Sequence, residues 1–178
     1  MNEGNDRAPR ARRIRLPAGS LLAASFADAD LADAYAIAVP EEASADVEAL
    51  ARAILANPPA WVRPLMSIRN RIMSRFGVRT SGEISRQAIR RNGRVVGGFP
   101  VHRRTADEIV MGADDLHLDF RTSMLLRQAR GGRELVWITA VHCHNRLGRL
   151  YLAGIKPFHR AIVPAYLDRA AGNGWVPH

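Results

Sequence analysis

The sequence of 178 residues is poor in cysteine, lysine and long apolar runs, with Cys143 and Lys156 the single examples of their kinds. One cysteine excludes an internal disulfide and fits a reducing compartment. No apolar run approaches the roughly 20 residues that span a bilayer, so we expect no stable membrane insertion. The basic N-terminal segment lacks the following apolar stretch of a signal peptide, and we therefore expect a cytoplasmic protein.

The basic charge is almost entirely arginine. Lysine and arginine together number 26, and the net charge is +9. Such a charge permits binding to nucleic acid or to an anionic membrane. The arginines are spread through the chain, however, and do not form an RNA-binding motif with interleaved aromatic residues. We expect a solvated basic surface and no nucleic-acid partner.

The hydrophobic content of 47% predicts a globular protein. Residues 1–15 are polar, rich in arginine and without periodicity, which indicates a mobile basic tail. The remaining residues 16–172 are expected to form a single domain, because no low-complexity linker or internal repeat divides them.

The first half of that domain is expected to contain one strand and two helices. Residues 33–40 alternate small and larger apolar side chains and predict a strand that ends at Pro40. Ser44 is a good N-cap for a helix that ends at residues 57–59, Asn-Pro-Pro. A second helix is predicted over residues 60–76.

The second half changes from a period of 3.6 to a period of 2. Strands are predicted at the following ranges: 95–103, 108–111, 116–126 and 134–144. The last is apolar on both faces, which is typical of a central strand.

A long helix closes the chain. Its apolar residues recur every three or four positions after Pro157. A proline suits the first turn of a helix, and the glycines at 172 and 174 mark the end of this one. Pro164 predicts a kink. The order of elements indicates an α+β fold, in which an antiparallel sheet with one apolar face is covered by this helix.

Several motifs occur in an order that resembles a known bacterial family of unknown function. They are Trp61-Val62-Arg63, Ile68-Arg69-Asn70-Arg71, Phe99-Pro100-Val101, the run from Asp115 to Arg121, Gly148-Arg149-Leu150-Tyr151 and Pro157-Phe158-His159. The family belongs to the START-like helix-grip superfamily, also called SRPBCC, and its members occur alone or fused behind NAD-binding domains similar to short-chain dehydrogenases. The resemblance covers about residues 16–171. It implies a curved antiparallel sheet with two short helices after the first strand and a long C-terminal helix over the concave face, enclosing an apolar cavity. It implies no settled activity.

We therefore expect a protein that binds a small apolar or amphipathic molecule in this cavity. Apolar liners with a few polar groups that orient the ligand are typical of such sites. The candidate ligand-binding residues are Phe99, Leu118, Phe120, Arg121, Met124, Trp137, Val141, His142, Tyr151, Phe158, Ile162 and Tyr166. Arg121 would hold a ligand carboxylate or phosphate if its strand face lined the cavity, but a pairing across the sheet is favoured for Arg121 and Asp119.

Two other functions remain open at this stage. The first is an enzyme that uses His142, His144 or His159 in acid–base or metal-assisted chemistry. The second, suggested by the fused relatives, is a partner module for a separate reductase. A homodimer is a candidate assembly. We expect no cofactor, because the chain has no GxGxxG after a strand. We also expect no metal: the histidine pair at 142 and 144 would need a third ligand from His102, His117 or Asp119, and it has neither HxxxH spacing nor an acidic partner nearby in the sequence.

Overall fold

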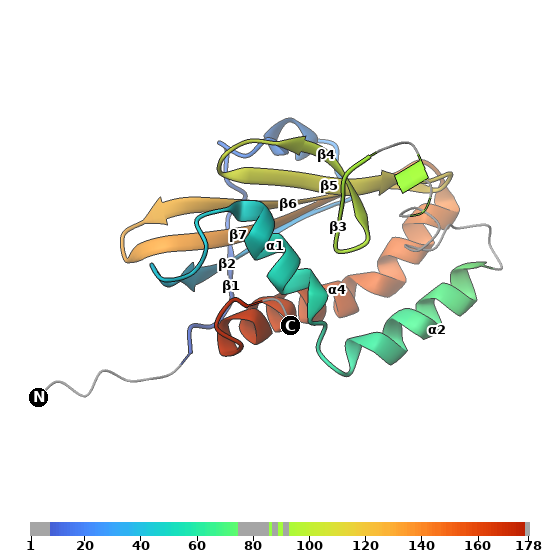
Figure 1. The fold of residues 1–178 in the computed structure, drawn as a ribbon. Coiled ribbons are helices and arrows are strands. Elements are labelled where there is room, and N and C mark those ends of the chain that lie inside the picture. The colour runs from blue at the N-terminus through green and yellow to red at the C-terminus, as the bar shows by residue number, and fades with distance from the viewer. Residues whose placement is uncertain (1–7, 75–85, 87–88, 91–92, 177–178) are drawn as a thin grey trace, which may run out of the picture.

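The computed structural model describes residues 8–74, 86, 89–90 and 93–176. Figure 1 shows a sheet with a long C-terminal helix and two shorter helices on one side of it. The elements follow one another as β1 (Arg12–Ile14), a 3₁₀ turn (Ala23–Ser25), β2 (Leu31–Val39), α1 (Val47–Ala56), α2 (Val62–Ser74), β3 (Val95–Val96), β4 (Phe99–Arg104), β5 (Glu108–Asp114), β6 (Leu118–Ala129), β7 (Gly132–Cys143) and α4 (Arg146–Gly172).

The described strands form one open antiparallel sheet of seven strands in the order β1-β2-β7-β6-β5-β4-β3. This confirms the α+β class and the long C-terminal helix. β6 and β7 pair along their whole length, from Leu118 opposite Cys143 to Ala129 opposite Gly132. β7 lies between β2 and β6, as its apolar character on both faces predicts.

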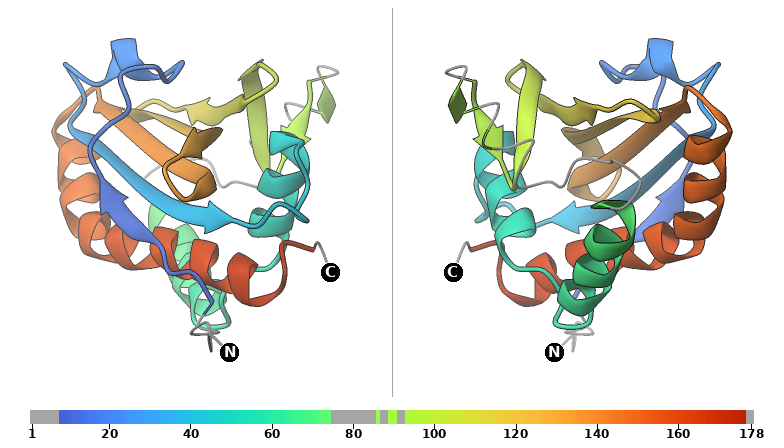
Figure 2. Two further views of the ribbon diagram at one scale, coloured as in Figure 1. Left: turned by 90° about the vertical axis from the view of Figure 1, so that its left-hand side faces the viewer. Right: turned by 90° about the vertical axis from the view of Figure 1, so that its right-hand side faces the viewer.

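The two faces of the sheet are covered by different parts of the chain. We call the face that carries Tyr35 and Trp137 the inner face; its core also contains buried residues of α1 and α4. Figure 2 shows α4 curving beneath this side of the sheet, with α2 on the same side. The outer face carries Ala36 and Ile138, which pack against Leu22 from the segment between β1 and β2.

Two local predictions need correction. The mobile tail expected over residues 1–15 does not hold for Arg12–Ile14, which form β1 at the edge of the sheet. A side-chain contact also holds this strand in place, because the Arg12 guanidinium donates a hydrogen bond to the Glu134 carboxylate over 2.6 Å. The single strand expected over residues 95–103 is instead a tight hairpin, since Gly97 and Gly98 adopt φ values of +57° and +88° that reverse the chain.

The C-terminal helix begins earlier than its proline suggests. Asn145 is the N-cap, and its side chain accepts a hydrogen bond from the Gly148 amide. Pro157 and Pro164 therefore lie inside α4. Each proline removes one hydrogen bond in the helix.

Glycine is required where α4 meets the turn between β5 and β6. A Cβ at Gly148 would lie 2.2 Å from the carbonyl oxygen of His117. The same oxygen accepts a hydrogen bond from the His144 amide. The start of α4 is thereby held against the end of the sheet.

Glu48 joins α1 to β4 and to the residue before β3, at the edge of the sheet opposite β1. Its buried carboxylate accepts hydrogen bonds from Arg52 and Arg94 and forms an ion pair with Arg104. The hydrogen bond from Arg52 is the largest influence on the pKa of Glu48 and lowers it, with Arg94 acting in the same direction and burial opposing them. A group with a lowered pKa stabilises the fold above its ordinary pKa, and this stabilisation disappears as the pH falls through the lowered value.

We predict that Glu48→Gln reduces the free energy of unfolding at pH 7 by about 1 kcal/mol, since the arginine partners are partly exposed. The difference from the wild type should shrink below pH 4. Urea unfolding at both pH values measures it, with Glu42→Gln as an exposed control. An equal difference at both pH values would show that the charge of Glu48 is not what stabilises the fold.

Candidate functional site

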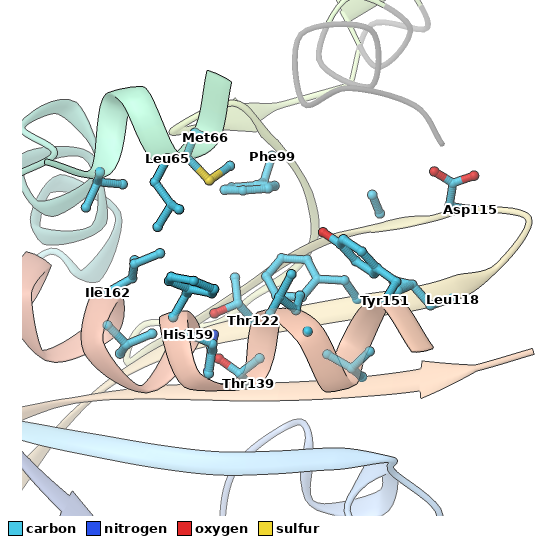
Figure 3. A pocket seen from close by; sticks show the side chains of 18 of the residues that line it. Leu65, Met66, Phe99, Asp115, Leu118, Thr122, Thr139, Tyr151, His159 and Ile162 are labelled. Atoms are coloured by element: carbon cyan, nitrogen blue, oxygen red, sulfur yellow. The ribbon is translucent and has the colours of Figure 1, made fainter. Parts of the chain in front are cut away.

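A pocket of about 670 Å³ lies between the inner face of the sheet, α2 and α4. Its walls are mostly apolar. Figure 3 shows Leu65 and Met66 of α2 on one side and His159 and Ile162 of α4 on the other. The sheet contributes residues from β4, β5, β6 and β7.

The pocket lies where α4 is not pressed against the sheet. Near its start, α4 buries Gly148 and Leu152, and near its end it buries Val163, Leu167 and Ala170. Between Leu152 and Val163 the helix has no buried residue. Leu152 belongs to a small cluster with Leu31 and Val141, whereas the last part of α4 packs into the main core. The helix is thus anchored at two separate places, and its middle section borders the pocket.

The structure brings together nine of the twelve candidate residues. The liners among them are Phe99, Leu118, Phe120, Trp137, Val141, Tyr151, Phe158, Ile162 and Tyr166. Two aromatic pairs contribute to the walls: the rings of Phe99 and Phe120 lie 5.6 Å apart, and those of Trp137 and Tyr166 lie 5.8 Å apart in an edge-on arrangement. Burial raises the pKa of the Tyr166 hydroxyl.

Three candidates lie outside the pocket wall. Arg121 is on the outer face, where it forms an ion pair with Asp114 and donates to the Phe120 carbonyl. His142 is also on the outer face, because it alternates with Val141 along β7. Met124 is on the inner face but fully buried in the core. The polar groups expected to orient a ligand therefore do not include Arg121 or His142.

A short row of polar side chains crosses the otherwise apolar inner face. Asp33 of β2 is opposite Thr139 of β7, and Thr139 is opposite Thr122 of β6. All three are almost completely buried. Figure 3 shows the two threonines close to His159 at the pocket wall.

His159 connects this row to α4. Its Nε2–H donates to Oδ1 of Asp33 over 3.0 Å, and the two side chains are 16% and 1% exposed. A carboxylate that accepts from one ring nitrogen selects the tautomer and leaves the other nitrogen as an acceptor. His159 itself lines the pocket, whereas Asp33 lies behind it.

Several buried polar atoms in this region have no hydrogen-bond partner among the described residues. They include Oδ2 of Asp33, Oγ1 of Thr139 and Nε1 of Trp137. Thr122 differs, since its hydroxyl donates to the Ile138 carbonyl over 3.0 Å. An unpaired buried polar atom costs about 1–3 kcal/mol, so these atoms need an explanation.

Sequence reasoning named His159 as a candidate acid or base but missed Asp33, Thr139 and Thr122. A signal for Asp33 was present, because it takes an inward position in a strand whose other inward residues include Tyr35 and Ile37. An acidic side chain at such a position is rare in a strand unless it has a partner. That partner, His159, is 126 residues away and could not be identified from spacing.

Within the described ranges, no three side chains of histidine, cysteine, aspartate or glutamate are grouped as metal ligands. His144 forms an ion pair with Asp119 over 3.1 Å. This pairing agrees with the cross-strand role favoured for Asp119.

Cys143 lies next to the pocket region but is buried, in a cluster with Leu31, Val141 and Leu152. Burial raises the pKa of its thiol, and the nearby charge of Asp30 adds to this effect. Reaction with thiol reagents requires the thiolate.

We predict that Cys143 reacts with 5,5′-dithiobis(2-nitrobenzoate) at least about tenfold more slowly in the native protein than in urea. Absorbance of the released thiolate measures both rates. Equal rates would contradict the burial of this side chain.

Comparisons with known proteins give one match. The model of a family described as "Protein of unknown function (DUF2867)" matches residues 25–166, a range that contains every described residue of the pocket wall. No curated protein and no solved structure matches the chain significantly. Among the described residues, no helix is both long and apolar enough to cross a membrane.

Proposed function

The chain belongs to the DUF2867 family of proteins of unknown function, and we propose that it binds an apolar or amphipathic small molecule in the pocket between the sheet, α2 and α4. The observation that carries this proposal is the pocket itself. Its volume of about 670 Å³ lies within the range of roughly 300–1,000 Å³ that is usual for small-molecule sites. Its apolar wall and few polar groups also match such sites.

We further propose that the fold is of the START-like helix-grip type and that the family is related to the SRPBCC superfamily. The support is the arrangement of a long C-terminal helix along one face of an antiparallel sheet, together with the motifs that resemble that family. The single cysteine supports a cytoplasmic location.

Acid–base catalysis on a bound substrate is a second candidate function. The observation that favours it is the hydrogen bond between His159 and Asp33 at the pocket wall, since a carboxylate that orients a histidine is a common arrangement in general-base catalysis. Mass spectrometry and NMR of the ligand before and after incubation separate the two functions, because an enzyme would convert its ligand into a product of different mass or, for an isomerase, of equal mass and different NMR spectrum.

We predict that the wild-type protein binds the neutral apolar dye N-phenyl-1-naphthylamine with a saturable rise in fluorescence. Ala113→Trp should weaken this binding by about tenfold or more, because Ala113 lines the pocket and the larger side chain would fill it. Fluorescence titration of the wild type and the variant measures the two affinities.

The matched control is Ala38→Trp. Ala38 is exposed and alternates with the inner-face residues of β2, so the added ring lies outside the pocket. The control should bind the dye as the wild type does. Equal binding by all three proteins would place the dye elsewhere and contradict the proposal.

A further inference from the structure

The polar group at the pocket wall has an arrangement that the apolar wall alone does not explain. His159 donates through Nε2 to Asp33. No hydrogen bond to its Nδ1 is present among the described residues, and the side chain keeps 16% of its surface exposed at the pocket. In the neutral ring Nδ1 is a hydrogen-bond acceptor, and the side chain that carries it lines the pocket.

Thr139 supplies the complementary group. Thr139 lies in the same row of the sheet as Asp33 and is one of the residues that line the pocket, and its hydroxyl is buried without a partner among the described residues. A hydroxyl can both donate and accept. An acceptor nitrogen and an unpaired hydroxyl beside one another are complementary to a group that itself donates once and accepts once.

From this arrangement we propose that Asp33, His159 and Thr139 form a recognition site for a hydroxyl group on the bound molecule. The ligand hydroxyl donates to Nδ1 of His159 and accepts from Oγ1 of Thr139. Asp33 acts through His159 as a positioning residue, because its carboxylate keeps the proton on Nε2. The inference rests on the proposed function and names its ligand class: an apolar alcohol or phenol.

Charge at the pocket disfavours the other classes of polar head group. Within the part of the chain that the structure describes, no arginine or lysine lines the pocket, so a carboxylate or phosphate would lack a cationic partner there. Such an anion would also meet the carboxylate of Asp33 behind His159. A ligand ammonium would find no carboxylate in the wall beside His159, because Asp33 is only 1% exposed and is not a lining residue, and Asp115, which does line the pocket, lies in its other part, toward Tyr151 and Leu118 (Figure 3). A neutral hydroxyl pairs with Nδ1 of His159 and Oγ1 of Thr139 without either problem.

The pocket also has room for the apolar part of a ligand next to His159 and Thr139. Figure 3 shows His159, Thr122 and Thr139 gathered in one part of the wall, with Tyr151 and Leu118 toward Asp115 in another. Aromatic and aliphatic side chains separate the two parts. A molecule with an apolar body would bury that body among them while its hydroxyl meets His159.

The test uses two probes of nearly equal shape, 2-naphthol and 2-methylnaphthalene, which differ by a hydroxyl in place of a methyl group. Each competes with N-phenyl-1-naphthylamine for the purified full chain at neutral pH. We expect the wild type to bind 2-naphthol about threefold to tenfold more tightly than 2-methylnaphthalene, the ratio that one net hydrogen bond supplies.

Thr139→Val should abolish most of this preference and leave the affinity for 2-methylnaphthalene unchanged. The substitution keeps the shape of the side chain and removes a hydroxyl that has no partner in the protein. Thr122→Val is the matched control: it lies in the next strand of the same row, but its hydroxyl is already bonded to the Ile138 carbonyl. This control should keep the preference of the wild type.

His159→Phe alone would leave the carboxylate of Asp33 buried without a partner and endanger folding. The double variant Asp33→Val/His159→Phe removes both polar groups, and a buried pair replaced by apolar residues is often tolerated. It should bind both probes with equal affinity.

The outcomes separate the inference from the proposed function. Binding of both probes with no preference in the wild type overturns the hydroxyl site and leaves the pocket as a binding site. Equal loss of preference in Thr139→Val and Thr122→Val likewise overturns the role of Thr139. Failure of 2-naphthol to displace the dye, although the dye itself binds at the pocket, overturns the inferred ligand class. Failure of the dye and of both probes to bind overturns the proposed function as well.

Discussion

The structure depends on how α4 is attached to the inner face of the sheet. One anchor is the start of the helix, where Gly148 lets the backbone approach the His117 carbonyl and Leu152 enters a small apolar cluster. The other is the last part, where Val163 and Leu167 join the main core. A helix held at two distant places need not touch the sheet between them, and this separation leaves room for the pocket.

In the middle of α4, where no residue is fully buried, two polar contacts reach β2 and the residue before it. His159 donates to Asp33, and the Lys156 ammonium donates to the Asp30 carbonyl over 3.1 Å. Polar contacts depend on direction and hold the helix at a defined distance, whereas apolar packing would draw it onto the sheet. The same His159 that helps to hold the helix also faces the pocket, so the support of the fold and the chemistry of the pocket share one residue.

The outer face of the sheet is covered by the segment between β1 and β2. Buried Glu108 accepts hydrogen bonds from the Ser20 hydroxyl, over 2.6 Å, and from the Leu21 amide, over 2.8 Å, which fastens the segment between β1 and β2 to that face. Leu22 then packs on Ala34, Ala36 and Ile138. Small alanines on this face let the covering segment lie close, while the larger inner-face residues hold α1 and α4 farther away.

Local patterns in the sequence determined the class of the fold, and together with the family resemblance they identified part of the apolar pocket wall, without the residues that α1 and α2 contribute. The change of period near the middle of the chain predicted helices before and strands after it, and nine of the twelve candidate residues line the pocket. Alternation along a strand determines which residues share a face, which is why Leu118 and Phe120 were identified together. It does not say which side chain reaches a cavity and which is packed beneath it, and for this reason Met124 was placed in the wall although it belongs to the core.

Tertiary structure decided the features that join distant parts of the chain. The start of α4 at Arg146 follows from the Asn145 cap and from contact with the turn before β6, although Pro157 favoured a later start. β1 is a strand because it pairs with β2 and because Arg12 reaches Glu134. Arg121 and His142 lie on the outer face of the sheet, and this position excludes them from the pocket. The polar row of Asp33, Thr139 and Thr122 comes from three strands and meets a histidine on a fourth element, and only the folded chain brings such residues together.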